Sequence, residues 1–237
     1  MSFSSKIFSL FKVEVILSLI SLIAGLIIAR ELGPDLRGLY AILLLIPSYS
    51  EAFGRLKLDV SSIYFLGKKR ISLGEMVFLL NTISILSSLA IIFFLIWNYN
   101  WIYLKLFNQV HIDVEFLFYT VILIIPLQAI SSNYTYLFLF QENTKKYNNL
   151  VILRSLLGSF SGILFLVYFE WGVFGVLLGS LIGLFSGVFY GFLEISKKEK
   201  MVPFFKPSLV WEMIKYSSQH YVAGIIGHLQ TYLTNLI

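Results

Sequence analysis

Long apolar runs, separated by short polar stretches, dominate the chain. A helix that crosses the hydrocarbon core of a bilayer, which is about 30 Å thick, needs roughly 20 mostly apolar residues. Six runs reach that length and a seventh extends to Ile237: 7–29, 39–66, 73–97, 116–140, 150–169, 173–194 and 216–237. The pattern predicts an all-α, polytopic membrane protein.

The connections divide this layout into three parts. Residues 1–195 are expected to form a six-helix transmembrane lobe, and residues 216–237 the first helix of a second, truncated lobe. Between them, 196–215 is a basic linker in which the stretch 207–216 has the pattern of an amphipathic helix. We expect that helix to lie at the cytoplasmic membrane interface.

Composition agrees with this prediction. The chain is 58% hydrophobic and 13% charged, with a mean hydropathy of +0.83, whereas soluble domains carry roughly 25% charged residues. There is no cysteine, which excludes disulfides and thiolate metal sites. A net charge of +5 would suggest nucleic acid in a soluble protein. In a membrane protein the basic residues instead concentrate in the cytoplasmic loops, so no nucleic-acid partner is expected.

The basic residues predict an orientation. One side of the predicted topology holds twelve of them: Lys6, Lys12, Lys68, Lys69, Arg70, Lys145, Lys146, Lys197, Lys198, Lys200, Lys206 and Lys215. The other side holds three: Arg30, Arg37 and Lys105. Because cytoplasmic loops carry the excess of Lys and Arg, the N-terminus is predicted to be cytoplasmic and the protein to lie in the cytoplasmic (inner) membrane.

Polar side chains recur at helical spacing in four successive predicted helices. They are Glu14, Ser18, Ser21 and Gly25; Ser48, Glu51, Arg55, Asp59 and Ser62; Asn81, Ser84 and Ser88; and Gln128, Ser132 and Thr135. Residues three or four apart share one face of a helix. Such faces often serve only to bond helices together. Four of them, two with ionisable groups, favour a shared water-filled cavity.

The run 39–66 carries four charges in its interior. At about 1.5 Å per residue its 28 residues exceed the bilayer core, so it must tilt or bend, and Pro47 predicts a kink. Glu51, Arg55 and Asp59 lie at i, i+4 spacing, while Lys57 points away and is expected to snorkel. The face they form is either a substrate or ion site or a structural salt-bridge ladder, because charges within a span rarely face lipid.

The run 173–194 presents a different face. Its glycines recur at a spacing of four: Gly175, Gly179, Gly183, Gly187 and Gly191. Such spacing lets helices approach closely, so packing is favoured over a sliding surface. A second proline, Pro126, predicts another kink in the run 116–140.

Several enzyme classes find no support in the chain. It contains neither GxxxxGK[ST] nor HExxH, and His111, His220 and His228 have no metal-like partners in the pattern. The loops between the runs are too short for a catalytic domain. We therefore expect neither an enzyme nor a cofactor.

Two motifs carry a family resemblance. The first predicted helix ends in AR-x-LGP and the second opens in G-x-Y: Ala29, Arg30, Leu32, Gly33, Pro34, Gly38 and Tyr40. After the linker comes W-x-x-x-K-Y-S: Trp211, Lys215, Tyr216 and Ser217. This pattern resembles polysaccharide-transport proteins of the multidrug/oligosaccharidyl-lipid/polysaccharide exporter superfamily, among them the Wzx-type lipid-linked oligosaccharide flippases. Members usually have 12–14 helices in two lobes, so the chain is expected to be an N-terminal fragment lacking most of its second lobe.

The resemblance implies a mechanism and roles for residues. Two lobes would rock around a central cavity and carry a polyprenyl-pyrophosphate-linked oligosaccharide while its lipid tail stays in the membrane. Substrate contacts would then fall on Arg55 first, and on Lys57, Arg30, Lys12 and Gln128. A coupling cation, H⁺ or Na⁺, would bind among Glu14, Glu51 and Asp59.

Two alternatives remain at this point. One is a cation-coupled multidrug antiporter of the same superfamily. The other is a membrane-embedded polysaccharide polymerase or glycosyltransferase, which usually needs a larger outer loop than this chain offers.

Overall fold

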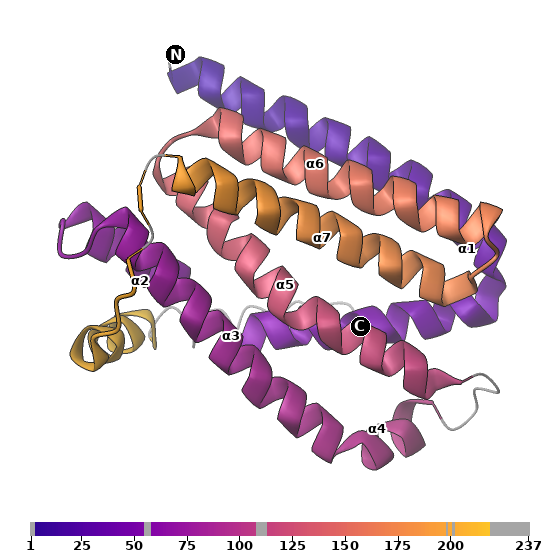
Figure 1. The fold of residues 1–237 in the computed structure, drawn as a ribbon. Helices are drawn as coiled ribbons and strands as arrows, with labels where there is room; N and C mark the ends of the chain where they lie inside the picture. The colour runs from indigo at the N-terminus through magenta and orange to yellow at the C-terminus, as the bar shows by residue number, and fades with distance from the viewer. Residues whose placement is uncertain (1–2, 55–57, 108–112, 198, 201, 219–237) are drawn as a thin grey trace, which may run out of the picture.

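A computed structural model describes residues 3–54, 58–107, 113–197, 199–200 and 202–218, and within these ranges the regular structure is helical with no strand. Figure 1 shows the helices in order. They are α1 (Phe3–Gly54), α2 (Leu58–Gly67), α3 (Leu73–Trp97), α4 (Tyr99–Leu106), α5 (Val114–Phe140), α6 (Thr144–Ile163), the π-helical η1 (Leu164–Tyr168) and α7 (Gly172–Ser196). A further helix over 207–218, here called the linker helix, follows.

The helices follow the predicted apolar runs. Five of them, counting α6 with η1, are long and apolar enough to cross a membrane, which suggests a multi-pass membrane protein. The run 73–97 coincides with α3, and the next three runs match α5, α6 with η1, and α7 to within a few residues at most ends. The first two runs share α1, and the second continues into α2. Most of the seventh, 219–237, lies outside the described residues.

Gly33 is where the first two predicted helices separate. It is the one position inside α1 whose backbone leaves the helical region, with φ 70° and ψ 178°. A side chain is strained there, and the following Pro34 suits the first turn of a new helix. Figure 1 shows α1 turning back at this point. The marked break is therefore at Gly33, whereas the kink was expected at Pro47.

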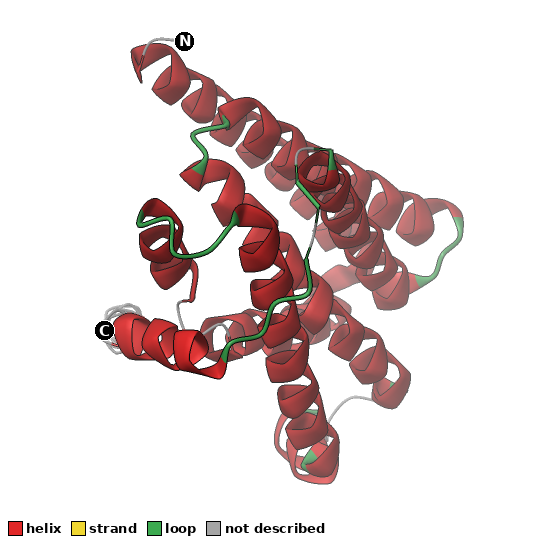
Figure 2. Ribbon diagram, turned by 60° about the vertical axis from the view of Figure 1, so that its left-hand side comes forward, coloured by secondary structure: helices red, strands yellow, loops and turns green. Residues whose placement is uncertain are grey.

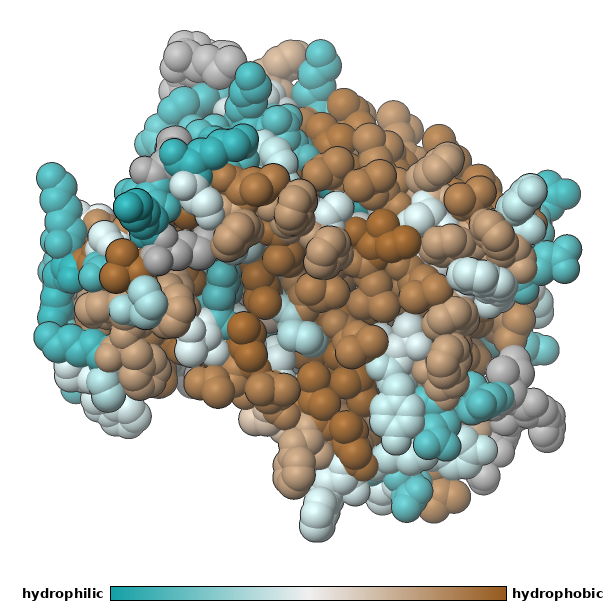
Figure 3. All heavy atoms as spheres, viewed as in Figure 1, coloured by the Kyte–Doolittle hydropathy of each residue, from teal (hydrophilic) through white to brown (hydrophobic). Residues whose placement is uncertain are grey.

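The two ends of the helix bundle differ in charge. The start of α1, the α2–α3 turn, the α5–α6 turn and the end of α7 meet at one end, here called the basic end (Figure 1). The opposite end holds the reversal of α1, α4 and the α6–α7 turn. In Figure 3 apolar side chains cover the region between these ends. The loops predicted to be cytoplasmic thus gather at one end.

Ion pairs join separate elements at the basic end. Lys6 Nζ lies 2.5 Å from Glu142, and Lys146 Nζ lies 2.7 Å from Glu194. The hydrogen bond from Lys6 lowers the pKa of the Glu142 carboxyl. These contacts fix the start of α1 and the end of α7 to the α5–α6 turn.

The glycines of α7 allow two helices to approach closely. All five predicted positions are buried. A Cβ at Gly179 or Gly183 would come within 3 Å of the α6 backbone at Gly158 or Gly162. The close-packing interpretation of this face is confirmed.

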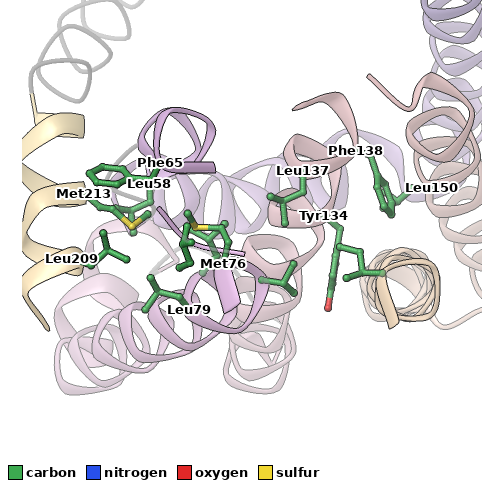
Figure 4. Close-up of a cluster of buried hydrophobic side chains, with 14 of the residues drawn as sticks. Leu58, Phe65, Met76, Leu79, Tyr134, Leu137, Phe138, Leu150, Leu209 and Met213 are labelled. Atoms are coloured by element: carbon green, nitrogen blue, oxygen red, sulfur yellow. The ribbon is translucent and has the colours of Figure 1, made fainter. Parts of the chain in front are cut away.

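The linker helix packs on the basic end through an apolar side. Leu209 and Met213 are 5% and 0% exposed and join a cluster with Phe65 and Met76 (Figure 4). Tyr216 stacks on Tyr64 with ring centroids 4.4 Å apart. The amphipathic helix predicted over 207–216 is confirmed as a helix, and it extends to residue 218.

Replacing Gly33 with alanine should destabilise the protein. An alanine would have to adopt the backbone conformation of Gly33, which strains a residue with a Cβ at a cost of about 1–3 kcal/mol. The measurement is thermal or denaturant unfolding of the purified protein in detergent micelles.

Gly38→Ala is the matched control. Gly38 is helical and no neighbour lies within 4 Å of a Cβ placed there, so alanine should stabilise the helix by about 0.5–1 kcal/mol. Shifts of the same sign in both variants would contradict the role assigned to Gly33.

Candidate functional site

A polar cavity lies within the helix bundle. Its volume is about 510 Å³, and it is bounded by α1, α5, α6 and α7. One acidic, one basic and several neutral polar side chains line it, and small and apolar residues lie between them. The polar side chains are Tyr40, Glu51, Gln128, Ser132, Arg154, Ser155, Ser159 and Ser180. Side chains of this kind inside an apolar bundle indicate a site for a polar ligand or water.

Glu51 is the acidic group of this cavity. Gln128 Nε2 donates to Glu51 Oε2 at 2.5 Å, and Ser132 Oγ donates to Glu51 Oε1 at 2.5 Å. Gln128 and Ser132 lie one turn apart on α5, so both reach the same carboxylate. Each carboxylate oxygen thus has a donor from α5.

Arg154 is the basic group, and it comes from α6. Its stem lies against α7, where a Cβ at Gly187 would sit 3.5 Å from Arg154 Cβ and 3.6 Å from Cδ. Its Nη1 lies 3.5 Å from Ser131 Oγ, and its charge is attracted to that of Glu51. The bare face of α7 therefore provides the space in which the arginine lies beside the cavity.

Hydroxyl groups extend the polar lining. Ser155 and Ser159 follow Arg154 on the cavity side of α6. Tyr40 of α1 and Ser180 of α7 also line the cavity. The cavity thus offers an anion, a cation, an amide and hydroxyls to a solute.

Two predicted polar faces meet here, and a third does not. Glu51 from the second run and Gln128 with Ser132 from the fourth converge on the cavity. The polar face of α3 instead bonds to α5. Asn133 Nδ2 donates to Ser84 Oγ at 2.9 Å and to Asn81 Oδ1 at 3.2 Å. For α3, helix-to-helix bonding is the interpretation that the structure supports.

Asp59 lies apart from Glu51. It lines a small separate void between α2, α3 and α5, together with Ser84 and Asn133. The two predicted neighbours on one face therefore border different spaces. Arg55 and Lys57, predicted to contact substrate, lie outside the described residues.

The remaining predicted residues are exposed and do not line the cavity. Lys12 and Glu14 are exposed on α1, and Glu14 accepts a hydrogen bond from Tyr147 of α6 at 3.4 Å. Arg30 lies near Gly33, at the end opposite the basic one. The structure does not bring these three to Glu51.

Arg154 was missed as a candidate. Its signal in the sequence is a single basic residue inside the apolar run 150–169, followed by small residues at helical spacing: Ser155, Gly158, Ser159 and Gly162. A lone arginine within a span rarely faces lipid. That rule was applied to the second run and would have identified Arg154 as well.

Metal binding has no support in the described part of the chain. No group of three or more His, Cys, Asp or Glu side chains there is placed to hold a metal ion.

No protein-family model, curated protein or solved structure matches this chain.

A single cysteine at Ser159 should react with a charged, water-soluble methanethiosulfonate reagent. The chain has no cysteine of its own, so each variant carries one thiol. Ser159 borders the cavity, and a thiol in water ionises to the reactive thiolate. The reaction rate is measured in membranes by mass spectrometry of the labelled protein.

Two variants serve as controls. Phe160 is 68% exposed on the apolar outside of the same helix, and Ser84 is buried between α3 and α5. Phe160→Cys should react at least about tenfold more slowly, because apolar surroundings disfavour the thiolate. Ser84→Cys should also react at least about tenfold more slowly, because a charged reagent does not reach a buried side chain. Equal rates at residues 159 and 160 would show that the cavity holds no water in the membrane.

Proposed function

We propose that this chain forms one lobe of a membrane transporter whose central cavity receives the anionic head of a lipid-linked oligosaccharide. The observation that carries the proposal is the cavity itself, with Glu51 and Arg154 on its lining. Each charge costs at least about 2.5–3.5 kcal/mol to insert at the centre of a span. Helix packing alone does not require that cost, because the neutral amides and hydroxyls between α3 and α5 bond those helices without it.

The size of the cavity supports a solute rather than simple packing. Small-molecule sites measure roughly 300–1,000 Å³, and this one has about 510 Å³. A structural salt bridge would be expected to close around its two charges. Here the carboxylate and the guanidinium border open volume.

The substrate class comes from the resemblance to polysaccharide-transport proteins. In this proposal Arg154 takes the anion-binding role first assigned to Arg55, because a planar guanidinium suits phosphate oxygens. Glu51 competes with the substrate for Arg154, and H⁺ or Na⁺ binding at Glu51 would release Arg154 to bind the substrate. Gln128 contacts sugar hydroxyls or the pyrophosphate.

The finer architecture belongs to the same proposal. The helices of residues 1–195 form a six-helix lobe in the cytoplasmic membrane, with the N-terminus and the basic end in the cytoplasm. A second lobe, beginning at 216–237, completes the cavity, and the lobes rock to expose it to either side. No catalytic role or cofactor is proposed.

Two other functions are separable from this one. A cation-coupled multidrug antiporter would use the same Glu51, but its loss would lower drug resistance rather than polysaccharide export. A polymerase would act after translocation, so its loss would leave the lipid-linked intermediate on the outer leaflet. A glycosyltransferase would act before translocation, so its loss would leave the intermediate unfinished.

The test measures the amount and the membrane leaflet of the lipid-linked intermediate in the host cell. Loss of the gene should reduce surface polysaccharide and accumulate complete polyprenyl-pyrophosphate-linked oligosaccharide on the cytoplasmic leaflet. Arg154→Gln at normal protein level should reduce export at least about tenfold, as expected for loss of a charge contact in a shielded site.

Arg37→Gln is the matched control, because Arg37 is exposed at the end opposite the basic one. It should export normally. Unchanged polysaccharide and intermediate in the deletion strain would refute the proposed substrate. A fall in drug resistance instead would favour the antiporter, and accumulation on the outer leaflet would favour the polymerase.

A further inference from the structure

The linker helix has a second face that its packing leaves exposed. Leu209, Met213 and Ser217 recur every four residues and are buried against the bundle. Trp211 and Lys215, also one turn apart, lie on the other side, and Trp211 is 68% exposed. An aromatic residue one turn from a lysine is typical of a helix lying in a membrane interface.

The segment before this helix has the same character. Val202 and Phe205 are 49% and 58% exposed, while Phe204 packs against the apolar cluster below. Lys200 and Lys206 are exposed beside them. Figure 2 shows this stretch crossing the end of the bundle in an extended form between α7 and the linker helix. Exposed apolar and basic side chains thus occur together in this segment.

Both described carboxylates of this segment are engaged with the bundle. Glu199 Oε2 accepts from the backbone N–H of Gly74 at 2.8 Å, at the start of α3. Glu212 Oε2 accepts from Arg70 Nη1 at 2.6 Å, and this bond lowers the pKa of Glu212. Glu212 is therefore paired with a cation, and Glu199 is held at the start of α3. With Lys200, Lys206 and Lys215 the segment has more basic than acidic side chains.

Neighbouring lysines enlarge the basic surface. Lys68 and Lys69, in the α2–α3 turn on which the linker helix packs, are exposed, and Lys68 Nζ lies 4.4 Å from the centroid of the Tyr64 ring. Tyr64 in turn stacks on Tyr216 of the linker helix. The turn and the helix thus form one continuous surface.

We propose that this surface, formed by Lys68, Lys69, Lys200, Phe205, Lys206, Trp211 and Lys215, binds the headgroups of anionic phospholipids in the membrane around the protein. Charge complementarity selects the ligand, since each lysine near an anionic leaflet contributes roughly 1 kcal/mol. Trp211 and Phe205 insert at the level of the headgroups and upper acyl chains. The lipid therefore holds the linker helix in place from outside while Leu209 and Met213 hold it from within. This inference does not depend on the transported substrate.

The distribution of tryptophan makes the proposal testable. Of the four tryptophans, Trp97, Trp101 and Trp171 lie at the end opposite the basic one and Trp211 lies on the linker helix. A variant that keeps Trp211 alone, with phenylalanine at the other three positions, is reconstituted into phosphatidylcholine vesicles. The vesicles contain, at equal mole fraction, either brominated phosphatidylglycerol or brominated phosphatidylcholine.

Brominated phosphatidylglycerol should quench Trp211 at least about twofold more than brominated phosphatidylcholine does. Adding Lys206→Gln and Lys215→Gln should remove the difference. A variant that keeps Trp171 alone should be quenched equally by both lipids. Equal quenching of Trp211 by the two lipids, or quenching by neither, would overturn the proposal.

A second measurement uses the protein with its own tryptophans. Native mass spectrometry of the detergent-purified chain, incubated with equimolar phosphatidylglycerol and phosphatidylcholine, should show retention of phosphatidylglycerol. Lys206→Gln with Lys215→Gln should reduce this retention several-fold, whereas Lys105→Gln at the opposite end should not. Equal retention by the two variants would also overturn the proposal.

Discussion

Ionised side chains cannot face hydrocarbon without a large cost, and the inner arrangement of this bundle follows from that constraint. Glu51 and Arg154 both belong to long apolar helices, and both turn toward a shared cavity. The carboxylate receives two donors from α5 and lies within electrostatic reach of the guanidinium. Each charge therefore lowers the cost of burying the other, and both side chains border the same polar cavity.

Two backbone features bring these charges together. The close contact of α6 and α7 over Gly158, Gly162, Gly179 and Gly183 fixes the height and rotation of Arg154, and Gly187 leaves room for its stem. The reversal at Gly33 returns the second half of α1 to the bundle with Glu51 on its inner side. Both features require glycine. Between α6 and α7 a side chain lacks space, and at Gly33 a side chain would strain the backbone. A cavity with paired charges is thus a consequence of backbone geometry as much as of the charged residues.

Apolar run length was sufficient to predict the long helices, since the bilayer dictates how long each must be, but not the short α4 between two runs. Helical spacing also identified Glu51, Gln128 and Ser132, because it shows which residues share a face. It cannot show how that face is rotated within a bundle, and so it could not separate α3, which bonds to α5, from the helices that line the cavity. For the same reason Asp59 was grouped with Glu51, and Arg154 was passed over because it stood alone in its run.

Glu51 and Arg154 are expected to stabilise each other inside the bundle. A double-mutant cycle with Glu51→Gln, Arg154→Gln and the combined variant measures this dependence through unfolding in detergent or lipid nanodiscs. Each single variant removes the attraction between the two groups, so the combined variant should be less destabilised than the sum of the two by about 1 kcal/mol or more. Effects that add to within about 0.3–0.5 kcal/mol would show that the two groups are independent, and would contradict the account.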